Sequence, residues 1–165
     1  MSVRLSFYYG KILIIFLLLS NSLNAYSYEN SLTIEGVNTA GEKIAIVLSR
    51  NQIEQLPQTS ITTHLPWVKE QTTFTGVKLT TLLTAYQLQT ETIHLKALND
   101  YSATVSWGYI RKYEPIVATR KDNQWLRIRD YGPYWLIFSL DQFPELNQRK
   151  SLGKMVWQLA TIITE

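Results

Sequence analysis

Short apolar segments, separated by turn-forming residues, recur along the chain from Leu32 to Ile163. Several alternate apolar and polar residues or are rich in Val, Ile and Thr, which is typical of β-strands. We therefore predict strands at residues 32–37, 43–48, 59–65, 92–98, 103–107, 115–119, 125–129, 134–138 and 155–163. Many short strands with few helices favour an α+β fold that is rich in β-structure.

Two segments have the patterns of short helices. Ser49, with Gln52 three residues later, matches a capping box and predicts a helix that ends before Pro57. Apolar residues at helical spacing predict a second helix over residues 79–87, and residues 74–77 are typical of a turn leading into it. We expect two or three short helices in all.

Residues 1–25 have the pattern of an export signal. A basic start at Arg4 precedes an apolar run over residues 12–19, which is shorter than the roughly 20 residues that a bilayer span needs. Ala25 then offers a small residue for cleavage. We predict a signal peptide of the general secretory type, a single mature domain over residues 26–165 and a periplasmic or secreted protein. An uncleaved membrane anchor is the alternative.

Removing that segment nearly neutralises the chain. The sequence has 16 Lys and Arg residues against 13 Asp and Glu residues. Arg4 and Lys11 are two of the basic residues and no acidic residue precedes Tyr26, so 14 basic residues remain against 13 acidic ones. Nucleic-acid binding needs a clustered basic face, so this balance excludes a nucleic-acid partner.

The chain contains no Cys. Disulfides, thiolate metal sites and Cys nucleophiles are therefore excluded. His64 lies between a predicted strand and a Pro-Trp turn, where its side chain would line a cleft. No second His and no carboxylate follows at a ligand spacing such as i, i+4, so we predict no metal site.

The segment from Trp125 to Asp130 contains a candidate anion site. A strand over residues 125–129 places Arg127 and Arg129 together on the face opposite the core, next to Asp130. Two guanidinium groups on one face suit a carboxylate, sulfate or phosphate. The alternative is a solvated face with surface ion pairs to acidic residues.

A polar loop follows the predicted strand at residues 92–98. Asn99, Asp100 and Tyr101 form this loop, and a buried strand that ends in a polar-aromatic loop commonly presents binding groups. Asn and Asp also form ordinary turns, so a purely structural turn is the alternative.

Five segments in this order carry a family resemblance: Phe74–Leu79, Ala97–Ser102, Pro115–Thr119, Arg129–Phe138 and Met155–Leu159. Together they resemble the molybdopterin-binding oxidoreductase domain of the sulfite oxidase type, in its short exported form. The resemblance covers about residues 30–163 and implies a mixed, strongly bent β-rich fold. It also implies cleft positions for Asn99, Asp100, Tyr101, Arg127 and Arg129.

Two features depart from the enzymes of that family. Their molybdenum is held by a Cys thiolate on the segment before the Phe-x-Gly-Val stretch, and here that segment, Ile61–Trp67, has no Cys. His64 is not an equivalent soft anionic donor. Exported family members also typically cross the membrane folded, with a twin-arginine signal, whereas Arg4 stands alone.

These departures favour a cofactor-free binding or accessory domain that holds a small anionic ligand. We expect it to serve a membrane sensor or another envelope protein. An oxidoreductase that binds molybdopterin without a Cys ligand, acting on a small oxyanion or sulfoxide, is the alternative, and a structural protein without a ligand is a third. The sequence shows no Ser-centred elbow, Gly-rich phosphate loop or carboxylate pair of a conventional hydrolase or nucleotide enzyme.

Overall fold

The computed structural model describes residues 30–88 and 90–165. Its strands are β1 (Ser31–Val37), β2 (Lys43–Ser49), β3 (Gln58–Leu65), β4 (Val68–Lys78), β5 (Thr92–Ala97), β6 (Ser102–Ser106), β7 (Ile116–Lys121), β8 (Gln124–Trp125), β9 (Trp135–Ile137) and β10 (Leu159–Thr164). Its helices are α2 (Arg50–Glu54), α3 (Leu79–Ala85), α4 (Trp107–Tyr113) and α5 (Arg149–Leu152), with 3-10 turns at Ile128–Asp130 and Pro144–Leu146. This content confirms a strand-rich α+β fold.

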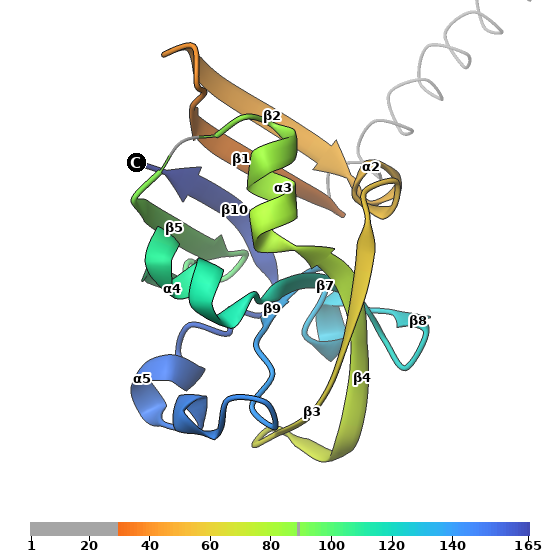
Figure 1. Cartoon of the computed structure of the whole chain (residues 1–165). Helices are drawn as coiled ribbons and strands as arrows, with labels where there is room; N and C mark the ends of the chain where they lie inside the picture. Colours follow the sequence, from red (N-terminus) through yellow and green to blue (C-terminus); the bar gives the residue numbers. More distant parts are fainter. Residues whose placement is uncertain (1–29, 89) are drawn as a thin grey trace, which may run out of the picture. The chain divides into compact units, whose positions relative to one another are not determined.

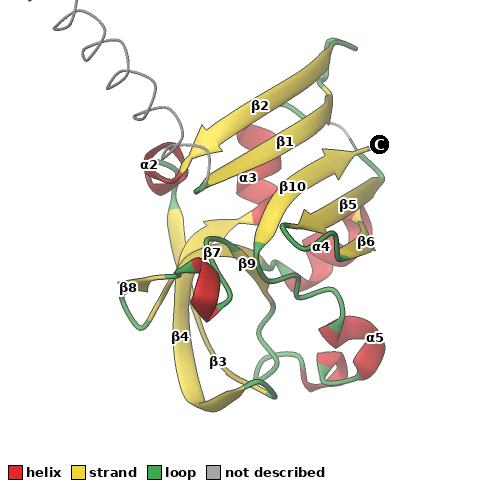
Figure 2. Ribbon diagram, turned by 180° about the vertical axis from the view of Figure 1, so that it is seen from behind, coloured by secondary structure: helices red, strands yellow, loops and turns green. Residues whose placement is uncertain are grey.

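The first sheet has the strand order β2-β1-β10-β5-β6. β10 lies in its centre, parallel to β1 and antiparallel to β5. Figures 1 and 2 show α3 and α4 covering one face of this sheet. Leu32 and Ile34, which alternate along β1, and Ile162, which pairs with Ile34, are fully buried. The sheet therefore has one face against the core.

The second sheet has the order β3-β4-β7-β8, and β9 also pairs with β7. All of these pairs are antiparallel. β3 and β4 form a long hairpin whose tip is closed by the pairing of Leu65 with Val68, which leaves Pro66 and Trp67 in the turn. Both views place this tip at the same end of the second sheet as α5 (Figures 1 and 2).

The largest fully buried side chains lie on or beside β9. They include Tyr134, Trp135 and Phe138, and the ring of Phe74 from β4 meets the ring of Trp135 edge-on at 5.4 Å. The indole N–H of Trp135 donates to the carbonyl oxygen of Met155 at 3.2 Å. This bond ties the segment before β10 to the core, because a buried indole N–H needs an acceptor.

Local sequence signals account for several elements. The hydroxyl of Ser49 accepts from the backbone N–H of Gln52, and the Gln52 side chain accepts from the backbone N–H of Ser49 at 2.9 Å, so the predicted capping box is confirmed. The strands predicted over residues 32–37 and 43–48 are also confirmed, and as β1 and β2 they pair in an antiparallel hairpin. Asn38 accepts from two backbone N–H groups in its turn, and Gly41 takes the positive φ of +81° that glycine tolerates best.

The prediction of a turn at residues 74–77 is wrong. These residues end the eleven-residue strand β4, and α3 begins directly after it at Leu79. A Cβ on Gly76 would lie 2.0 Å from the carbonyl oxygen of Val117, so this glycine permits close contact between β4 and β7 instead of making a turn. The number of helices is also larger than expected, since the described residues contain four.

The predicted strand over residues 155–163 begins four residues too early. β10 begins at Leu159, and Gln158 just before it has a φ of +51°, which interrupts an extended backbone. The side-chain amide of Gln158 donates to the carbonyl oxygen of Ile128 at 3.0 Å. The apolar residues from Met155 to Trp157 therefore belong to a loop and not to the sheet.

The predicted strand over residues 125–129 is also wrong beyond its first residue. β8 contains only Gln124 and Trp125, and Ile128–Asp130 form a 3-10 turn. The carbonyl oxygen of Arg127 accepts from the backbone N–H groups of Asp130 and Gly132, each at 2.8 Å, and these bonds close the turn. The alternation of faces that placed Arg127 and Arg129 together does not apply here.

The predicted signal peptide, residues 1–25, lies outside the described residues. From Ser31 to Glu165 the chain forms one contact unit. Within residues 30–88 and 90–165, no helix has both the length and the apolar character needed to cross a membrane.

Candidate functional site

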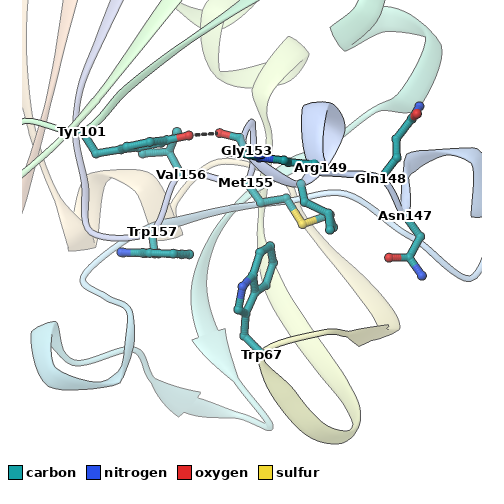
Figure 3. A pocket seen from close by; sticks show the side chains of 10 residues that line it. Trp67, Tyr101, Asn147, Gln148, Arg149, Gly153, Met155, Val156 and Trp157 are labelled. Atoms are coloured by element: carbon teal, nitrogen blue, oxygen red, sulfur yellow. Dashed lines mark hydrogen bonds between the residues drawn. The ribbon is translucent and has the colours of Figure 1, made fainter.

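A cavity of about 420 Å³, which we call the aromatic cavity, opens beside the tip of the β3–β4 hairpin (Figure 3). Three segments that are distant in the sequence supply its walls: the hairpin turn, the β5–β6 loop and the chain from Asn147 to Trp157. Its lining residues are Trp67, Tyr101, Asn147, Gln148, Arg149, Leu152, Gly153, Met155, Val156 and Trp157. Most of this surface is apolar or aromatic, which is typical of sites for small organic molecules.

Two indole rings dominate the wall. Trp67 and Trp157 meet edge-on, with ring centroids 5.7 Å apart and an interplanar angle of 78°. Trp67 also approaches the buried Trp135 at 6.3 Å, so the core holds its ring in place. Figure 3 shows Trp67 beside Met155, with Trp157 on one side and Asn147 and Gln148 on the other. These contacts hold the two rings against each other in the wall of the cavity.

Tyr101 reaches the cavity from the β5–β6 loop. Its hydroxyl donates to the carbonyl oxygen of Gly153 at 2.8 Å, the bond drawn in Figure 3. Asp100 has a φ of +65°, and the side-chain oxygen of Asn99 accepts from the Tyr101 backbone N–H at 3.2 Å. Asp100 itself forms an ion pair with Lys96 at 3.1 Å. Asn99 and Asp100 thus build the turn, and Tyr101 carries the contact with the cavity.

A basic groove of about 530 Å³ adjoins the cavity. It is lined by Tyr101, Ser102, Ala103, Thr104, Arg149, Lys150, Gly153 and Lys154, and none of these residues is acidic. The ammonium of Lys154 donates to the carbonyl oxygen of Thr104 at 2.9 Å. Burial lowers the pKa of Lys154, and the nearby charge of Lys150 lowers it further. Positive charge is therefore concentrated in the groove.

Arg127, Arg129 and Asp130 line a different cavity, of about 480 Å³, together with Trp125 and Tyr131. Asp130 pairs with both arginines, at 2.9 Å from Arg127 Nε and 3.7 Å from Arg129 Nε. Both guanidinium groups are exposed. These contacts match the alternative of a solvated face with surface ion pairs, and they make this face a weaker candidate for an anion than the groove.

His64 lies at the end of β3, where it contacts Asp141. The carboxylate of Asp141 accepts from the His64 backbone N–H at 3.0 Å and from the Gln71 side chain at 2.9 Å, and His64 Nδ1 is 3.0 Å from Asp141 Oδ2. The backbone N–H of His64, followed by Gln71, lowers the pKa of Asp141 from 3.8 to about 2. This network ties the hairpin to the chain that follows β9. His64 and Asp141 line a separate cavity of about 460 Å³, which shares only Asn147 with the cavity beside Trp67.

A thiolate-bound molybdenum does not fit this chain. The segment Ile61–Trp67 forms the end of β3 and the hairpin turn, and no residue of the protein is a Cys. Among the described residues, no three His, Asp or Glu side chains gather closely enough to hold a metal ion.

Sequence patterns did not single out Trp67, Arg149 or Trp157 as site residues. The three residues belong to two segments far apart in the sequence, and no spacing rule connects them. The sequence signal that could have indicated the cavity is Trp67 in the Pro-Trp turn. A large aromatic side chain in a turn has few neighbours along the chain, so it must pack on a distant segment or on a ligand. Neither the models of known protein families nor the curated proteins include a match to this chain.

Proposed function

We propose that this chain is an exported, cofactor-free binding domain that holds a small organic molecule in the aromatic cavity. The observation that carries the proposal is the apolar wall formed by Trp67, Trp157 and Met155 around about 420 Å³. Sites for small molecules usually have this size, an apolar lining and a few polar groups that orient the ligand. Here Tyr101 and Arg149 supply such polar groups.

We also propose that the fold is that of the molybdopterin-binding oxidoreductase domains. Two of the five segments that carry the resemblance, Ala97–Ser102 and Met155–Leu159, contribute residues to the wall of this one cavity. Convergence of such segments supports a shared ligand-binding cleft. Because the chain has no Cys, we propose binding in this cleft instead of molybdenum chemistry.

The location we propose is the periplasm or the exterior of the cell, where the domain serves a membrane sensor or another envelope protein. The signal pattern over residues 1–25 supports this location. The mature chain should begin near Tyr26, as measured by intact mass of the protein from the envelope fraction. A full-length species that stays in the membrane would contradict export by cleavage.

Binding can be tested with phenylnaphthylamine, a neutral apolar fluorophore, excited by energy transfer from tryptophan. Leu152→Trp places an extra ring in the cavity and should abolish the signal, and Trp67→Leu should weaken binding roughly tenfold, equivalent to about 1.4 kcal/mol. Trp125→Leu is the matched control, because Trp125 lies on β8 and does not line the cavity. Thermal melting checks that each variant is folded. Equal affinity in all three variants would refute the proposed site.

Measuring the molybdenum content tests whether the protein lacks a molybdopterin cofactor. Protein purified from its native envelope should contain no stoichiometric molybdenum, because no Cys thiolate is present to hold the metal. A molybdenum content close to that of the protein would overturn the cofactor-free proposal. It would instead support an oxidoreductase that holds molybdopterin without a protein thiolate.

A further inference from the structure

We propose that the ligand is an amphipathic organic anion, whose apolar body fills the aromatic cavity while its acidic group lies in the basic groove. This inference rests on the proposed binding function and adds the chemical class of the ligand. Its basis is that an apolar surface and a basic surface lie next to each other.

The cavity and the groove share a boundary. Tyr101, Arg149 and Gly153 line both of them, so the two surfaces are direct neighbours. The hydrogen bond from Tyr101 to Gly153 holds the β5–β6 loop against the chain beyond α5 at this boundary. Figure 3 shows Arg149 close to Gly153. A ligand with one apolar end and one charged end matches this arrangement.

The charges of the groove call for an anion. Arg149, Lys150 and Lys154 line it without any acidic residue, and no ion pair within residues 30–88 and 90–165 includes these three side chains. Arg127 and Arg129 differ, since Asp130 pairs with both. An anion in the groove would therefore gain charge-assisted hydrogen bonds without having to displace a carboxylate of the protein.

Lys154 is held in position to donate such a bond. Its ammonium donates to the Thr104 carbonyl oxygen on β6 and lies 5.4 Å from the ring centroid of Tyr109. An ammonium has three N–H donors, so Lys154 has donors to spare after that bond. A partly buried lysine that is already oriented loses less side-chain entropy when it binds an anion than a mobile surface lysine does.

The test compares two fluorophores with the same apolar body. Phenylnaphthylamine is neutral, and anilinonaphthalene sulfonate adds one negative charge. The sulfonate should bind roughly tenfold or more tightly than the neutral probe, since one charge-assisted hydrogen bond exceeds the 1.4 kcal/mol of a tenfold change. In Arg149→Gln and Lys154→Gln this preference should fall toward equality. Because the two affinities are compared within each variant, a general loss of cavity binding cancels.

Arg127→Gln is the matched control, because it removes the same charge from a different cavity and should keep the preference. Decanoate should displace the sulfonate probe, whereas vesicles of phosphatidylglycerol should not. Equal binding of the two probes to the wild type would overturn this inference and leave the binding function standing. Failure of both probes to bind would overturn the binding function itself. Displacement by vesicles but not by decanoate would refute a free amphipathic ligand.

Discussion

Replacing Thr63 with Val tests how the hairpin is joined to the chain that leads to the cavity. Thr63 is fully buried, and its hydroxyl oxygen accepts from the backbone N–H of Leu140 at 2.9 Å and from that of Asp141 at 3.2 Å. Val keeps the shape of the side chain but removes the acceptor. A buried N–H left without an acceptor costs about 1–3 kcal/mol. The backbone N–H of Leu140 is buried, so the loss of its acceptor has the full cost. The backbone N–H of Asp141 is only partly buried and can bond to solvent, which lowers the cost of losing its acceptor.

We therefore expect Thr63→Val to lower the free energy of unfolding by about 2–3 kcal/mol. Urea denaturation of the purified protein measures this change, and the midpoint should fall by roughly 1 M with an unchanged slope. Thr62→Val is the matched control. The Thr62 hydroxyl is exposed and forms a hydrogen bond with the Thr73 hydroxyl, so its loss should lower the free energy of unfolding by no more than about 0.5 kcal/mol. If the two variants were equally stable, the role assigned to the Thr63 hydroxyl would be refuted.

Two other predictions concern pH and close packing. Folding lowers the pKa of Asp141 from 3.8 to about 2, chiefly through the backbone N–H of His64, so this carboxylate stabilises the fold above pH 3.8 and loses that effect as the pH falls toward 2. The urea midpoint of Asp141→Asn should therefore fall less than that of the wild type as the pH is lowered over that range. If the two midpoints fell equally, Asp141 would not be the source of this pH dependence. Gly76→Ala would place a Cβ 2.0 Å from the Val117 carbonyl oxygen and should cost more than about 4 kcal/mol in thermal melts. Gly108→Ala should cost almost nothing, because no atom outside its chain neighbours and the backbone of its own helix lies within 4 Å of the added carbon. Similar losses in both variants would refute the packing argument.

Much of the fold could be predicted where local signals agree with tertiary contacts. The capping box at Ser49, the hairpin at Asn38 and the strands β5 and β6 follow from residue types within a few positions of each other. The prediction failed at Ile128 because Leu126 and Ile128 have the spacing of a strand, whereas backbone bonds to Arg127 close a turn there. Periodicity alone does not distinguish these two structures.

The candidate site was harder to predict than the fold. Of the residues proposed from sequence, Tyr101 lines the aromatic cavity, while Arg127 and Arg129 line another. The cavity depends on Trp67 and Trp157, which meet only after the β3–β4 hairpin and the loop before β10 have packed on Trp135. Such a site arises from tertiary contacts between distant segments, and no local pattern records it.

The central position of β10 also affects the order of folding. Thr33 of β1 pairs with Thr161 of β10, so the middle of the first sheet is a contact between positions that span most of the chain. Closing so large a loop costs chain entropy before packing offsets it, so we expect slow folding. Until β10 arrives, β1 and β5 have no partner on their inner edges. A chain that emerges gradually, from the ribosome or along the proposed export route, would therefore remain incompletely folded until β10 has emerged. Until then it would present two open strand edges to chaperones.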